Sequence, residues 1–155
     1  MSSGAAPVLL PDEDAEVAES AEEGMTIDTI TYRTIKAAMV VHSAIGPGSL
    51  EKVYDACLYG ELERAGLQFE HQVKFSVDYG GTHIAAAFRV DYLVEDCVLV
   101  ELKAVEKLHP LHTSQLLSYL KISRKTVGLL INFNVVHLRD GIRRVVNGYQ
   151  PESKV

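Results

Sequence analysis

Residues 89–104, RVDYLVEDCVLVELKA, constrain the fold of this chain more than any other stretch. Two apolar segments, each suited to a buried strand, are separated by the turn-forming pair Glu95-Asp96. Asp91, Glu101 and Lys103 nevertheless lie inside these segments. Because taking an ion out of water costs several kcal/mol unless it is paired or bound to metal, the charges require an explanation.

The register of the two predicted strands decides whether these charges meet. Glu101 and Lys103 are two residues apart and therefore point to the same face. A strict two-residue turn at 95–96 would pair Asp91 with Val100, on the opposite face. An odd-length connection, such as three residues with a bulge, would pair Asp91 with Glu101. We expect the second register, because only it brings both carboxylates to the ammonium group.

The rest of the chain predicts a mixed α/β fold. Helical spacing of apolar residues predicts helices before the hairpin and between its last strand and the next one, and alternation predicts the other strands. A three-strand antiparallel meander followed by a right-handed crossover helix into a parallel strand gives a mixed four-stranded sheet flanked by helices. For the C-terminal part, the sequence allows either a short strand or a turn, followed by a short element over 141–147. The predicted helices cover 27–45, 49–66 and 109–123, and the predicted strands cover 69–79, 83–94, 97–104 and 126–133.

Composition separates an acidic N-terminal segment from one globular domain. The chain has 155 residues, of which 47% are apolar and 23% charged, as is usual for a soluble domain. Residues 1–24 contain seven acids and no Lys or Arg, which predicts a disordered acidic tail. The remainder has 14 acids and 15 bases, a formal charge of +1. We expect a domain over 25–150 and a flexible C-terminus over 151–155.

Localisation signals are lacking. No apolar run approaches the ~20 residues needed to span a bilayer, and no basic region precedes an apolar block at the N-terminus. Cys57 and Cys97 are too few for a disulfide framework. These features predict a cytoplasmic protein without a membrane partner.

Two carboxylates beside an ammonium group suit metal-dependent chemistry on phosphate. Adjacent carboxylates raise one another's pKa unless a cation neutralises them. Oxygen-only ligands with positions open for water and phosphate favour Mg²⁺ or Mn²⁺. Lys103 would then orient or deprotonate a water molecule, or stabilise charge on a scissile phosphate.

The segment VDYL…VELKA resembles the Asp…(Asp/Glu)-x-Lys signature of the PD-(D/E)XK nuclease superfamily, with Val90 in place of the proline before the first acid. Downstream, QLLSY at 115–119 is similar to the Q-x-x-x-Y element of the RecB-like branch. Upstream, GSLEKVY at 48–54 is similar to the motif of the bacterial GxxExxY protein family. The resemblance extends from about Tyr32 to Asn147 and implies a restriction-endonuclease-like core.

The resemblance also implies roles for individual residues. Asp91 and Glu101 would hold Mg²⁺ or Mn²⁺, with Glu51 as an additional acid and metal ligand. Lys103 would activate water, and Gln115 would position the lysine or a phosphate. A simpler interpretation of Glu51 is that it complements the dipole of its helix. The candidate phosphate contacts are Tyr119, His112, Lys121 and Arg124, for which core packing, helix initiation and solvated faces are the alternatives.

These observations predict a metal-dependent nuclease that hydrolyses phosphodiester bonds in DNA, with RNA as the second candidate substrate. The alternative is a non-catalytic nucleic-acid-binding or protein-interaction module that retains the nuclease fold. Basic residues are scattered rather than massed, which mildly favours this alternative. A homodimer or a protein partner also stays open, because small nucleases of this fold often need a second copy to address two strands.

Overall fold

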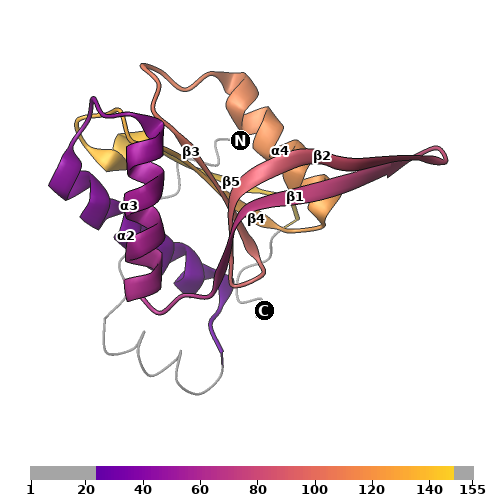
Figure 1. Cartoon of the computed structure of the whole chain (residues 1–155), viewed down its shortest axis with the longest axis horizontal. Helices are drawn as coiled ribbons and strands as arrows, with labels where there is room; N and C mark the ends of the chain where they lie inside the picture. The colour runs from indigo at the N-terminus through magenta and orange to yellow at the C-terminus, as the bar shows by residue number, and fades with distance from the viewer. Residues whose placement is uncertain (1–23, 149–155) are drawn as a thin grey trace.

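The computed structural model of the chain describes residues 24–148, and the predicted acidic tail (except Gly24) and the C-terminus over 151–155 lie outside this range. A single five-stranded sheet has α2 and α3 on one side and α4 on the other (Figure 1). The elements in chain order are α2 (Ile27–Ile45), α3 (Glu51–Arg64), β1 (Phe69–Tyr79), β2 (Thr82–Val94), β3 (Val98–Lys103), α4 (Pro110–Ser123), β4 (Val127–Asn132), the 3₁₀ helix η2 (Leu138–Gly141) and β5 (Ile142–Val146).

The sheet has the order β1-β2-β3-β4-β5, and only β3 and β4 run parallel. The predicted meander and the crossover through α4 are therefore confirmed, but the sheet has five strands rather than four. The additional strand, β5, pairs antiparallel with β4. Its two adjacent arginines, Arg143 and Arg144, break the apolar pattern of a central strand, because they lie on an edge strand where long polar side chains reach solvent.

Each face of the sheet has its own apolar core. The α2–α3 core takes Val98, Val100 and Leu102 from β3, whereas the α4 core takes Leu99 from the same strand. Glu101 and Lys103 follow Leu99 at intervals of two residues and therefore lie on the α4 side of β3. None of the helices within residues 24–148 is long and apolar enough to cross a membrane.

The connection between β2 and β3 has the odd length that the sequence predicts. Three residues separate Val94 from Val98, and these two are Cα partners across the hairpin. Glu95 and Asp96 both have positive φ angles, 51° and 56°, and Cys97 N–H donates to Val94 O at 3.0 Å. Extending this register by one residue beyond the Tyr92–Val100 pair places Asp91 opposite Glu101.

Candidate active site

The site forms where β2 separates from β3, a place that we call the fork. Asp91 N–H donates to Glu101 Oε1 at 2.8 Å, and Leu102 N–H donates to Asp91 Oδ2 at 2.8 Å. The two carboxylates thus bridge the strands beyond the last paired residues, Tyr92 and Val100. Each acid is fixed by the backbone of the opposite strand, which places both at one point of the sheet.

Burial makes these two acids hard to ionise together. Burial and, after it, the charge of Asp91 raise the pKa of Glu101 to about 7, although the hydrogen bond from Asp91 N–H and the charge of Lys103 oppose the rise. Burial also raises the pKa of Asp91, although the hydrogen bond from Leu102 N–H opposes it. Near neutral pH the pair therefore retains a proton in a large fraction of molecules, and a bound cation would displace that proton.

Lys103 is the cation that the sheet places beside this pair. It is half-buried at the end of β3, on the same face as Glu101. Its ammonium group forms no hydrogen bond or ion pair with any described residue, whereas its carbonyl oxygen accepts from Phe133 N–H at 3.0 Å. The strand therefore holds the backbone of Lys103 firmly and leaves its side chain available.

Helix α3 brings two more acids to the site. Loss of hydration raises the pKa of Glu51, the charge of Asp91 raises it further, and the charge of Lys103 opposes the rise. Asp55, one turn later on α3, acts in the same direction on the pKa of Glu51 and of Asp91. Asp55 also accepts a hydrogen bond from His71 Nε2 at 2.9 Å. The structure thus brings Glu51 to the pair and adds Asp55, which sequence reasoning missed despite its i+4 spacing from Glu51.

A glycine-containing loop aims the first turn of α3. Gly48 has a φ of +96°, which favours glycine, and its N–H donates to Asn134 Oδ1 at 3.0 Å. The hydroxyl of Tyr54 donates to Gly46 O and accepts from Ser49 N–H. The Tyr54 ring is fully buried. Within the G-x-x-E-x-x-Y motif, the glycine and tyrosine therefore fix the loop from which Glu51 projects.

Asparagines after β4 hold the surrounding loops. The buried Asn132 side chain accepts from Val105 N–H at 3.0 Å and donates to Val105 O at 2.9 Å. Asn134 binds the Gly48 loop as described above. Because β3 and β4 are parallel, both end at this edge, where polar residues typically line a site. Sequence reasoning missed Asn132 and Asn134, although their position directly after an apolar strand was a usable signal.

His112 lies at the start of α4, where its ring has a defined tautomer. Its Nδ1 accepts from His109 N–H at 3.0 Å, while His109 Nδ1 accepts from Leu111 N–H at 3.0 Å. The Nε2 atoms of both rings therefore carry the hydrogen in the neutral form. Burial lowers the pKa of His112, and the charge of Lys103 lowers it further. His112 is thus a neutral donor within electrostatic reach of the site.

Gln115 and Tyr119 lie on α4 at the i and i+4 positions of the Q-x-x-x-Y element. Tyr119 stacks on Phe88 with ring centroids 4.1 Å apart and planes 4° apart. Burial raises the pKa of Tyr119, and the charge of Glu101 raises it further. Gln115 is exposed and forms no hydrogen bond with any described residue. The structure therefore brings Tyr119 to the site, and Gln115 lies exposed between His112 and Tyr119 on the same face of α4.

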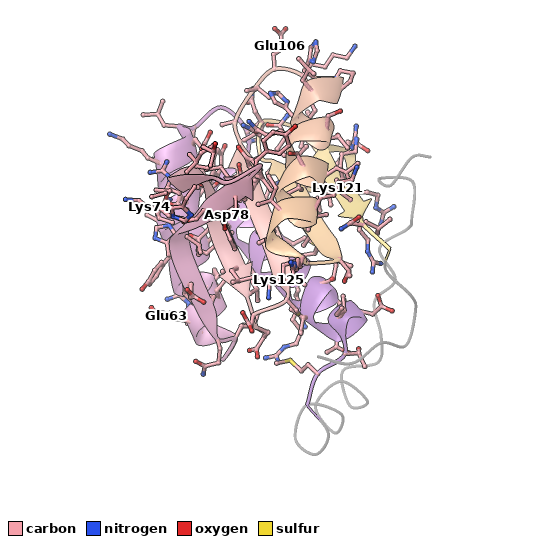
Figure 2. All side chains as sticks on the ribbon, turned by 90° about the vertical axis from the view of Figure 1, so that its right-hand side faces the viewer. Glu63, Lys74, Asp78, Glu106, Lys121 and Lys125 are labelled. Carbon is pink, nitrogen blue, oxygen red and sulfur yellow. The ribbon has the colours of Figure 1, made fainter. Side chains whose placement is uncertain are left out.

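Lys121 and Arg124 lie toward the other end of α4. At about 1.5 Å per residue, Arg124 is roughly 18 Å along the helix axis from His112. The next residue, Lys125, donates to Asp96 O at 2.8 Å, beside the β2–β3 turn. Figure 2 shows α4 running from the side of Glu106 toward Lys125, with Lys121 between them. These two basic residues are therefore not part of the cluster around Asp91.

The donor atoms suit a hard divalent cation. Within residues 24–148, no three His, Cys, Asp or Glu side chains already stand together as a metal site. Asp91 and Glu101 would supply two carboxylate oxygens, and Mg²⁺ typically takes one or two carboxylates and fills its other positions with water and substrate phosphate. The charge of Asp91 also raises the pKa of Glu101, and a cation bound between the two carboxylates would relieve this repulsion.

A protein-family model described as the PD-(D/E)XK nuclease superfamily matches residues 28–145. The matched range begins in α2 and ends in β5, so it contains the whole sheet except Val146, the last residue of β5, and every residue of the fork between β2 and β3. No curated protein and no solved structure matches the chain.

Proposed function

The chain belongs to the PD-(D/E)XK nuclease superfamily, and on this premise we propose that it is a nuclease that uses Mg²⁺ or Mn²⁺ to hydrolyse phosphodiester bonds, with DNA favoured over RNA as substrate. Nucleases of this superfamily generally use divalent metals and bind nucleic acid. We further propose that the chain is a GxxExxY protein of the RecB-like branch, which its Gly48, Glu51 and Tyr54 support.

The observation that carries the proposal is the interlocked pair at the fork. Asp91 and Glu101 lie on two different strands, yet each accepts a hydrogen bond from the backbone of the opposite strand. Such an arrangement fixes the separation of two partly buried carboxylates, although their repulsion destabilises the fold. A structural ion-pair network would instead pair each acid with a cation, and neither acid has an ion-pair partner among the described residues.

Each residue of the site would have its own role in the reaction. Asp91 and Glu101 would hold the metal, with Glu51 reaching the same ion from α3. The metal, when bound, lowers the pKa of a water molecule and neutralises charge on the phosphate. Lys103 would orient that water or donate to the scissile phosphate, since its ammonium group has no other partner among the described residues. His112 Nε2–H and the Tyr119 hydroxyl would donate to phosphate oxygens from α4, with Gln115 beside them.

A cleavage assay tests this function. We expect the full chain to cut labelled DNA in Mn²⁺ or Mg²⁺, and chelator to abolish the cleavage. The variant Glu101→Gln should also abolish it, because an amide cannot supply a carboxylate oxygen to the metal. Single- and double-stranded DNA and RNA of one sequence, compared side by side, identify the substrate.

Two results would contradict the proposal. Cleavage that survives in Glu101→Gln at wild-type rate would show that the nuclease activity comes from a contaminant or another site. Failure of Mn²⁺ to bind by calorimetry, together with no cleavage of any substrate, would favour the interaction module that retains the nuclease fold.

A further inference from the structure

The β1–β2 ribbon projects far beyond the body of the domain (Figure 1). β2 pairs with β1 along most of its length but with β3 only from Tyr92 to Val94. From residue 74 to residue 89 nearly all side chains of the ribbon are exposed or half-buried. We call this part the arm. Because its backbone is paired only with itself, the part of the arm beyond Phe75 and Phe88, which pack on the α4 core, presents both of its faces outside the core.

The ribbon turns over where it leaves the sheet. Near the sheet, His71 and Tyr92 lie on the α3 side, because the His71 ring contacts Tyr59 of α3. At the base of the arm, Val73 and Val90 pack into the α4 core instead, although Val73 lies two residues from His71 and Val90 lies two residues from Tyr92. Residues at intervals of two normally share a face.

Gln72 accounts for the switch on β1. Its φ is +58°, which a non-glycine residue rarely adopts in a strand. On β2, the change of face occurs at Asp91, because Tyr92 packs on the α3 side and Val90 packs on the α4 side. The acid that joins the active-site fork is therefore also the point where the ribbon turns over.

Lys74 and Arg89 lie directly opposite each other at the base of the arm. Their neighbours in both strands face α4, so these two side chains point to the other face, and Figure 2 shows Lys74 on the side of the ribbon away from α4. Both residues are exposed, and neither forms a hydrogen bond or ion pair with any described residue. Like charges directly opposite each other destabilise a ribbon. Within residues 24–148, no acid forms an ion pair with either residue to relieve this repulsion.

The basic pair lies close to the acids. Burial raises the pKa of Asp91, and the charge of Arg89 is one of the influences that lower it. Two strand residues span about 6.6 Å, which corresponds to roughly two nucleotides at 3.4 Å of rise per strand. Glu51, Asp55, Asp91 and Glu101 make the surroundings acidic, so a polyanion approaching the site requires added positive charge.

We propose that Lys74 and Arg89 together bind one phosphate of a nucleic-acid backbone, a nucleotide or two from the bond that is cut, so that the arm holds the strand against the site. A shared phosphate would convert the repulsion between the two cations into a bridged contact. The proposal rests on the proposed function, because it assumes a nucleic-acid ligand, and it adds the place where that ligand is gripped. The arm continues for about 20 Å from this pair to the Gly80-Gly81 turn, long enough to follow several nucleotides.

The variant Lys74→Glu separates binding from stability. It replaces a like-charge pair with an opposite-charge pair facing Arg89, so the melting temperature should stay equal or rise. Affinity for a labelled DNA oligonucleotide, measured by fluorescence anisotropy in chelator at low salt, should fall at least tenfold. The slope of log affinity against log salt should become shallower by about one to two contacts. The matched control is Arg64→Glu, which makes the same charge change at the exposed far end of α3.

The outcomes distinguish the binding of a phosphate by Lys74 and Arg89, which we call the clamp, from the proposed function. Equal losses of affinity in Lys74→Glu and Arg64→Glu would show general electrostatics and overturn the clamp while the nuclease remains. A fall in melting temperature with the loss of binding would assign the pair a structural role, and the neutral variant Lys74→Gln checks this independently. No binding of wild-type protein to any nucleic acid would overturn the proposed function and the clamp together.

Discussion

Asp91 and Glu101 hold each other's strands: Glu101 Oε1 accepts from the Asp91 N–H, and Asp91 Oδ2 accepts from the N–H of Leu102, which follows Glu101. The acids therefore contribute to the fold of the fork as hydrogen-bond acceptors while they oppose it as neighbouring charges. Substitutions that keep the acceptor and remove the charge separate these two effects.

The variant Glu101→Gln should be more stable than the wild type without metal. The amide oxygen can still accept from Asp91 N–H, and the amide NH₂ replaces a repulsive charge with a donor facing Asp91. Thermal unfolding at pH 8 in chelator should show a higher melting temperature, whereas cleavage should be lost. Addition of Mn²⁺ should raise the melting temperature of the wild type more than that of the variant. A less stable variant would contradict the view that charge repulsion strains the fork.

The stability of the metal-free wild type should fall as the pH rises from about 4.5 to about 7. Burial raises the pKa of Glu101 from 4.5 to about 7, so in this window the folded state binds a proton that the unfolded state releases. Protons bound preferentially by the folded state stabilise it at low pH, and this contribution disappears as the pH passes the folded pKa. Relative to Glu101→Gln, the loss should be on the order of 3 kcal/mol. Urea unfolding of both proteins at pH 5 and pH 8 measures it, and equal pH dependence would contradict the raised pKa.

The variant Lys103→Met should bind nucleic acid but fail to cut it. The aliphatic part of the side chain is retained, and no described partner loses a hydrogen bond. A residue that orients or deprotonates the attacking water typically contributes ~10²–10⁴-fold to the rate. Single-turnover cleavage and anisotropy on the same oligonucleotide separate the two effects. Lys107→Met, an exposed lysine in the following loop, is the control, and equal rates for the two variants would exclude a catalytic role for Lys103.

The variant Tyr54→Phe should loosen the loop before α3. It keeps the ring stacked on Phe133, with centroids 4.6 Å apart, but removes the hydroxyl that binds Gly46 and Ser49. We expect a cost of about 1–3 kcal/mol from the unsatisfied loop groups. Cleavage should fall as well, because Glu51 would no longer be held toward the metal. Tyr79→Phe at the exposed arm tip is the control. A loss of stability without any loss of activity would show that Glu51 takes no part in the reaction.

The sequence predicted the fork because charges are conspicuous within apolar strands. Asp91, Glu101 and Lys103 break the strand pattern, and the length of the connection at 95–97 fixes their register. Because only an odd-length connection brings these three charges together, the charges alone predicted that connection. The β5 strand was harder to predict, because an edge strand tolerates adjacent arginines that resemble a loop.

Other parts of the site depend on contacts that span long sequence separations. Asp55 acts on Asp91 across 36 positions, and Asn134 binds Gly48 across 86. Neither contact leaves a local pattern, since the first joins α3 to β2 and the second joins the loop before α3 to the segment after β4. The overturned ribbon was equally hidden, because alternation along β1 continues unbroken through Gln72 while the face that it addresses changes.

Because the ribbon turns over at Gln72 and Asp91, the face that a side chain of the arm occupies is set by its distance from these two residues and not by the alternation in the sheet. Removing one residue from each strand near the tip would shorten the arm and leave the basic pair on its present face. Removing Val73 would instead turn Lys74 toward α4 and take it out of register with Arg89. The reach of the arm can therefore change in paired steps while Lys74 and Arg89 keep their present face.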